Sequence, residues 1–170
     1  GHAPINTLYL YSINIPGFSV AKNIAVGSAP VWVVARPDSA KVYVLDNSGT
    51  IYDIDTLSDT VTGTSTSAGA GSNFMAFDPV VQRLYVTNPA NGKVAILNTA
   101  TDPNPPTLLK VIDLAQGPNA PCPTLCSPVS VTPIGDGSRA YVASYQLATC
   151  TISAIPCVNT QVEVINTGSN

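Results

Sequence analysis

A strand–turn–strand pattern occurs three times along this 170-residue chain, and this internal repeat constrains the fold more than any other feature of the sequence. The three copies begin at Pro30, Ser72 and Pro128. In each copy a tyrosine follows thirteen residues after the first residue, and a Lys or Arg lies two residues before that tyrosine. Turn-forming Pro, Asp and Gly separate the two apolar runs of a copy. Each copy therefore predicts two antiparallel strands joined by a tight turn.

Further strand-like segments follow each copy. Apolar third strands are predicted over residues 50–55, 93–98 and 161–166, and more polar fourth strands over 59–66 and 108–114. Residues 6–13 and 18–26 have the pattern of a third and a fourth strand without the two that should precede them. No segment has the 3.6-residue apolar period of a helix. The sequence predicts an all-β array of four-stranded antiparallel units that repeat every 42 residues or so, the spacing from Tyr43 to Tyr85.

The predicted strands divide the chain into four units. Residues 1–27 form a partial unit that contains a third and a fourth strand. Residues 28–70 and 71–117 form complete units, and residues 118–170 form a partial unit with cysteine-bearing loops. A four-stranded unit of this length is typical of a β-propeller blade.

The motif in the second complete unit resembles a known repeat family. Residues 84–88, Leu-Tyr-Val-Thr-Asn, contain the sequence that names the YVTN family of β-propeller repeats, and the chain is similar to that family from about residue 6 to residue 167. The second copy lacks the opening proline, and the third carries an insertion before its third strand. The resemblance implies blades and a bacterial or archaeal surface context, but no chemistry. About three blades are too few for a closed ring of the usual four to eight, so we expect an array that is open or completed by another chain.

Aromatic residues at equivalent repeat positions are expected to form the core. These residues are Trp32, Tyr43, Phe74, Tyr85 and Tyr141. We expect each of the three tyrosines to be buried between sheets, and the first strands to line a central channel with apolar side chains. Trp32 is also a candidate platform for sugar stacking, but Phe74 at the equivalent position favours a packing role.

Four cysteines form two closely spaced pairs, Cys122 with Cys126 and Cys150 with Cys157. The spacings differ from common zinc frameworks, and the only histidine is His2, so disulfides are favoured over a metal. Short loops close at the least entropic cost, which favours the two local pairings. Pairing between the loops is the alternative, because both loops are expected at one rim. Disulfides imply an oxidising compartment, so we predict an extracellular or cell-surface protein, with the periplasm as the alternative.

Catalytic chemistry has little support in the sequence. Nucleophilic triads need a histidine or an equivalent base, and paired-carboxylate catalysis needs convergent acids. Turns and the repeat pattern explain most of the ten acidic residues, and Asp46 is the one left unassigned. The glycine-rich segment 68–72 has no following lysine or helix, so a loop is favoured over a phosphate site. We predict no enzyme activity, no metal and no cofactor.

Composition excludes several other classes of protein. The chain has 7 Lys and Arg against 10 Asp and Glu, and the seven cations are scattered, so a nucleic-acid interface is not expected. No apolar run reaches the length of a membrane span. With 45% apolar residues, the chain is not of the disordered class.

The two ends of the chain suggest how it acts. The N-terminal pair of strands lacks two inner strands, and the C-terminal trio lacks an outer one, so both ends should expose unpaired strand edges. We therefore predict a non-catalytic structural protein that acts by protein–protein interaction or self-assembly, with copies of itself as partners through terminal strand addition, as a dimer, a filament or a surface layer. The alternative is a fragment of an exported propeller enzyme or ligand-binding protein whose site lies in missing blades.

Overall fold

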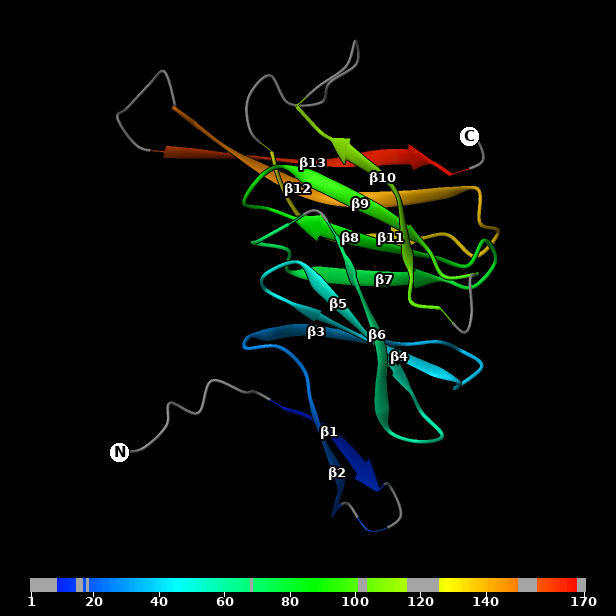
Figure 1. Ribbon diagram of the computed structural model, residues 1–170. Helices are drawn as coiled ribbons and strands as arrows, with labels where there is room; N and C mark the ends of the chain where they lie inside the picture. The colour runs from blue at the N-terminus through cyan, green and yellow to red at the C-terminus, as the bar shows by residue number, and fades with distance from the viewer. Residues whose placement is uncertain are drawn as a thin grey trace, which may run out of the picture.

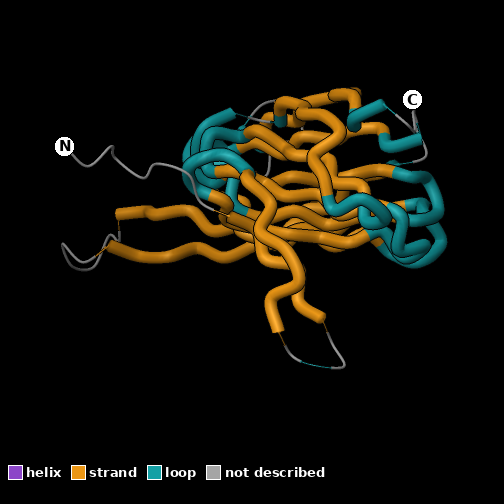
Figure 2. The backbone as a smooth tube through the Cα atoms, turned by 60° about the horizontal axis from the view of Figure 1, so that its bottom comes forward, coloured by secondary structure: helices purple, strands orange, loops and turns teal. Residues whose placement is uncertain are grey.

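The computed structural model describes residues 9–14, 17, 19–67, 69–100, 104–115, 126–149 and 156–167, of which residues 9, 14, 148, 149, 156 and 157 are described by their backbone alone. The described residues form strands and no helix (Figure 2). No stretch of them is a helix long and apolar enough to cross a membrane.

The strands form four antiparallel sheets, each built from consecutive strands. The N-terminal sheet contains β1 (Tyr9–Asn14) and β2 (Ser19–Ala25). The second sheet contains β3 (Pro30–Ala35), β4 (Lys41–Asp46), β5 (Thr50–Asp55) and β6 (Thr60–Thr66). The third sheet contains β7 (Phe74–Asp78), β8 (Arg83–Asn88), β9 (Lys93–Asn98) and β10 (Thr107–Asp113). The C-terminal sheet contains β11 (Ser127–Pro133), β12 (Arg139–Thr149) and β13 (Pro156–Asn166).

The four sheets are stacked face to face in sequence order, from the blue N-terminal sheet at the bottom of Figure 1 to the orange and red C-terminal sheet at the top. The first strands of the three larger sheets lie side by side, because β7 contacts both β3 and β11. The outer strands are also neighbours, since β6 contacts β2 and β10. The predicted all-β array of four-stranded antiparallel units is confirmed, and the described sheets do not close into a ring. The exact boundaries of the four units stay a prediction.

The strand register shows that the sheets are copies of one unit. The tyrosine of each second strand pairs with the same position of its first strand: Tyr43 with Val34, Tyr85 with Ala76, and Tyr141 with Thr132. The pairs β5–β6 and β9–β10 each run for four residue pairs, then a bulge, then two more pairs. The pair β1–β2 has the same pattern. The N-terminal sheet is therefore a third and a fourth strand, as the sequence predicts.

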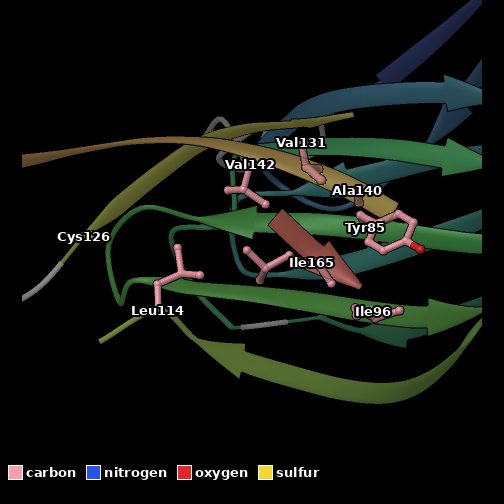
Figure 3. Close-up of a cluster of buried hydrophobic side chains, with 9 residues drawn as sticks. Tyr85, Ile96, Leu114, Cys126, Val131, Ala140, Val142 and Ile165 are labelled. Atoms are coloured by element: carbon pink, nitrogen blue, oxygen red, sulfur yellow. The ribbon is translucent and has the colours of Figure 1, made fainter. Parts of the chain in front are cut away.

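Apolar side chains fill the space between successive sheets. Figure 3 shows the cluster between the third and C-terminal sheets, where Tyr85 and Ile96 face Val142 and Ile165. A second cluster between the second and third sheets contains Tyr43, Ile51, Met75, Leu84, Val86 and Leu97. A third, smaller cluster joins the N-terminal and second sheets through Ile24, Val26, Val44 and Ile54. The core is thus a series of similar interfaces rather than one central cluster.

Three expectations differ from the structure. The insertion expected before the third strand of the last unit is strand over its described residues, because β12 runs to Thr149 and β13 begins at Pro156. The first strands are expected to line a central channel, but their residues Met75 and Val131 are buried between neighbouring sheets. Successive side chains of a strand point to opposite faces of the sheet, and these two point to the faces that pack together. Tyr141 is only partly buried, unlike Tyr43 and Tyr85, because no described sheet covers its side of the C-terminal sheet.

Candidate interaction surfaces

The outward face of the C-terminal sheet exposes apolar residues at positions that are buried in the other sheets. Ile165 and Val142 point toward the third sheet, so the alternating Val162, Val164 and Tyr141 point away from it. Val162 and Val164 are 64% and 55% exposed. Their equivalents by register in the third sheet, Val94 and Ile96, are 0% and 6% exposed. We call Tyr141, Val162 and Val164 the C-terminal end face.

The opposite end of the stack has a matching surface. Leu10 packs toward the second sheet, so Tyr11 and Ile13 on the same strand point away from it. Ile13 is 59% exposed, whereas its equivalents Ile54 and Leu97 are 1% and 0% exposed. Val20 pairs with Ile13 across the sheet and is also exposed. We call Tyr11, Ile13 and Val20 the N-terminal end face.

A groove lies between β1 and the inner strands of the second sheet, where the N-terminal sheet has no described inner strands. It has a volume of about 320 Å³ and is lined by Leu10, Pro30, Val31, Trp32, Val33 and Val44. Val33 pairs with Val44 and points to the same side, yet it is half exposed while Val44 is buried. In the sheets that have a preceding first strand, the equivalents of Val33 are Met75 and Val131, and both are buried. The groove is the space that inner strands occupy elsewhere in the stack.

Trp32 packs against its equivalent in the next sheet. The ring centroids of Trp32 and Phe74 are 4.2 Å apart, and the rings are inclined by 43°. Such a tilted pair contributes packing energy beyond the buried area alone. The contact supports the packing role for Trp32, although part of its ring also borders the groove.

Asp46, the acid that the sequence leaves unassigned, organises two loops. Its Oδ2 accepts hydrogen bonds from the backbone N–H groups of Ser28 (3.1 Å) and Ala29 (2.8 Å), and its Oδ1 accepts one from that of Ser48 (2.7 Å). Burial raises the pKa of this carboxyl, but the backbone donors outweigh it, so the pKa of Asp46 lies below its ordinary value. Gly27 has a positive φ of 36° and no room for a Cβ beside this carboxylate. Asp46 is a structural residue.

Asn88 has the corresponding role in the third sheet. Its Oδ1 accepts hydrogen bonds from the N–H groups of Ala90 and Asn91, and its Nδ2 donates to the carbonyls of Gly69 and Ala70. Asn88, the last residue of the Tyr-Val-Thr-Asn motif, therefore connects two segments by hydrogen bonds. One is the loop that precedes β7, and the other is the turn that follows β8. The glycine-rich segment 68–72 is thus held as a loop at this point, and residue 68 itself lies outside the described residues.

A buried ion pair lies between the second and third sheets. Lys41 Nζ is 3.2 Å from Asp53 Oδ2 and 3.2 Å from Thr62 Oγ1. Both charged side chains are almost fully buried. By register, Asp53 stands where the third sheet has the apolar Ile96, and Lys41 stands where the third sheet has Arg83. The pair brings two opposite buried charges into contact.

The cysteine predictions fall largely outside the described residues. Cys122 and Cys150 are outside them, and only the backbone of Cys157 is described. Cys126 is fully buried and takes part in a disulfide, and the side-chain amide of Gln161 donates a hydrogen bond to its sulfur. The local pairings and the cross pairing both stay predictions.

Among the described residues, no three His, Cys, Asp or Glu side chains come together as a candidate metal site. The turn acids accept backbone hydrogen bonds: Asp38 from Ala40, Asp78 from Val80 and Asp136 from Ser138. The candidate site is therefore the pair of end faces. Sequence reasoning located the open strand edges but missed the faces, because the outward position of Val162 or Ile13 follows only from the register.

Comparison with known proteins reveals similarity only at the level of structure. No family model matches the sequence, and no curated protein matches it. A functionally unknown protein from Desulfotomaculum acetoxidans DSM 771 superposes with a TM-score of 0.63 at 18% identity, over 94% of this chain and 49% of that one. The Cps50 (Swd1) β-propeller domain of Myceliophteria thermophila superposes with a TM-score of 0.58 at 12% identity, over 80% of this chain and 39% of that one. The fold is that of a β-propeller.

Each sheet is accordingly a propeller blade, and the chain is an open series of blades. Hydrazine synthase from Kuenenia stuttgartiensis is a further structural neighbour, with a TM-score of 0.54 at 15% identity, over 84% of this chain and 51% of that one. This chain spans about half the length of the first two structures that it matches. At these identities the similarity concerns the fold alone.

Proposed function

We propose that this chain is a non-catalytic propeller segment that acts through protein–protein contacts at its two open ends. The observation that supports the proposal is the exposure of Ile13, Val162 and Val164 at register positions that every internal blade buries. Soluble proteins rarely expose such contiguous apolar surface unless it binds something. The last strand also supports the proposal. β13 pairs with β12 along one edge, and no described strand pairs with its other edge.

Strand addition at β13 is the proposed mode of contact. The complete blades end in a fourth strand, β6 or β10, that the C-terminal blade lacks among its described strands. An added strand would satisfy the backbone groups of β13 and extend the blade. The partner then supplies an extended, apolar segment of the same kind.

A peptide with the sequence of β10, Thr107–Asp113, tests this mode directly. We expect the fluorescently labelled peptide to bind the chain with a saturable rise in anisotropy. A peptide N-methylated at alternate residues keeps the side chains but loses half of its backbone donors, so it should bind at least about tenfold more weakly. Binding no tighter than that of a scrambled peptide would show that the β13 edge does not accept a strand.

We also propose that the chain is exported, to the cell surface or the extracellular space, and that it belongs to the YVTN type of repeat. The support is the disulfide at Cys126 together with the motif at residues 84–88. Non-reducing peptide mapping should find Cys122 joined to Cys126 and Cys150 joined to Cys157. A fragment that joins Cys126 to Cys150 would overturn the local pairing, and free thiols throughout would remove the support for export.

A second candidate function is that of a ligand-binding or catalytic propeller to which this chain contributes only some blades. The observation that favours it is the length comparison, since the chain spans about half of each of the first two structural neighbours. Intact mass of the protein isolated from its source tests it. A mass far above 17.5 kDa would favour this second candidate.

A further inference from the structure

We propose that the two end faces bind each other, so that the C-terminal end face of one chain packs on the N-terminal end face of a second copy. This inference rests on the proposed function and names the partner. It concerns packing of sheet faces, which is separate from the pairing of a strand at the β13 edge.

Each end face repeats one half of an interface already present in the chain. Between the third and C-terminal sheets, Tyr85, Val94 and Ile96 on one side meet Val142 and Ile165 on the other. Tyr141, Val162 and Val164 occupy the register positions of Tyr85, Val94 and Ile96. The C-terminal end face is therefore the first half of this interface without its second half.

The N-terminal end face supplies the third-strand part of the second half, whereas the second-strand part, Val142 in the C-terminal sheet, has no counterpart among its described strands. Ile13 occupies the register position of Ile165, and it lies on the face of its strand that corresponds to the buried face of β13. Ile54 and Leu97 occupy the same register position in the second and third sheets, and each packs against the preceding sheet. A second copy thus carries the third-strand part of the surface that the C-terminal end face lacks.

The two end faces are different, so identical faces do not match each other. Within the chain, the sheet face that carries the second-strand tyrosine packs on the opposite kind of face of the next sheet. Tyr85 meets the face with Ile165, and Tyr43 meets the face with Leu97. The contact is therefore heterologous, and repeated head-to-tail contacts give either a closed ring or a filament.

Charge does not oppose this contact. The named residues of both end faces are Tyr, Ile and Val, and Arg139, two residues before Tyr141 on β12, is an exposed cation on the same side of that strand. Lys22 is the nearest cation along β2, and it donates a hydrogen bond to the carbonyl of Ser58 in the second sheet rather than standing on the N-terminal end face. Apolar burial without ion pairs predicts association that salt does not weaken.

Two single variants test the proposal when each is studied alone and then in a mixture. Ile13→Asp places a charge on the N-terminal end face, and Val164→Asp places one on the C-terminal end face. Both positions are exposed, so folding should persist, and near-UV circular dichroism checks this. Leu57→Asp in the exposed turn between β5 and β6 is the matched control, because it adds the same charge away from both faces.

Sedimentation velocity over a concentration series gives the readout. We expect the wild-type chain and Leu57→Asp to associate beyond the monomer mass of 17.5 kDa as concentration rises. Each end-face variant should associate at least about tenfold more weakly, because a buried carboxylate without a partner is strongly disfavoured. The equimolar mixture should regain association but stop at the dimer, since only one intact pair of faces remains. Val162→Asp should behave as Val164→Asp does.

Two results would overturn the proposal. If either end-face variant alone still forms dimers as readily as the wild type, the contact joins identical faces. If the wild-type chain stays monomeric throughout, the faces do not bind a second copy. The peptide assay at β13 is independent of both results, so failure here is distinguishable from failure of the proposed strand addition.

Discussion

Tyr85 and Tyr141 are the same residue of the repeat in two different surroundings. Both lie on a second strand and pair with the equivalent residue of a first strand. Tyr85 is fully buried between two sheets, whereas Tyr141 is partly exposed on the C-terminal end face. The contrast shows that burial at a repeat position depends on the neighbouring blade and not on the residue itself.

Replacing each tyrosine by alanine should lower the free energy of unfolding by different amounts in these two surroundings. Tyr85→Ala should lower the free energy of unfolding by about 3–5 kcal/mol, because it removes a large buried side chain and leaves a cavity. Tyr141→Ala should cost less than half as much in the monomer, since water already reaches its ring. Denaturant unfolding at low protein concentration measures both values. Equal losses for the two variants would show that the register assignment is wrong.

At the scale of the element, the turns and loops are fixed by side chains that cap backbone groups. Asp46 and Asn88 end their second strands, and each holds a loop between blades as well as the following turn. The two residues differ in chemistry. The carboxylate of Asp46 accepts hydrogen bonds with both oxygens, whereas the amide of Asn88 accepts with one atom and donates with the other.

The variant Asp46→Asn should therefore be destabilised, and by an amount that depends on pH. An amide retains one acceptor oxygen, so the variant loses the bonds of Oδ1 or Oδ2 and about 1–2 kcal/mol of stability at pH 7. The folded state holds the pKa of Asp46 below its ordinary value of about 3.9. The contribution of the carboxylate is therefore complete above pH 4 and is lost as the pH falls through the lowered pKa.

Denaturant unfolding of wild type and variant at pH 7 and near pH 3 measures this dependence. The difference in unfolding free energy between them should be largest at pH 7 and should shrink toward pH 3. A difference that does not change with pH would contradict the assigned role of the carboxylate.

At the scale of the whole molecule, the sequence predicts the strands better than the surfaces. The third strands at residues 50–55 and 93–98 match β5 and β9, because apolar alternation and flanking turn residues define them locally. The extension of β12 and β13 was not predicted, since loop-like composition and strand propensity compete in that segment. The end faces depend on which blade neighbours which, and that information is not local to any segment.

In the proposed association, Tyr11 and Tyr141 lie on two surfaces that cover each other when copies of the chain meet. Hydroxyl-radical footprinting of the wild-type chain at low and high concentration tests it with native residues as probes. We predict that Tyr11 and Tyr141 are labelled in the dilute protein and become protected together on concentration, while Tyr43 and Tyr85 stay unlabelled throughout. Labelling of Tyr11 and Tyr141 that does not change with concentration, or labelling of Tyr85 equal to that of Tyr141, would contradict the account.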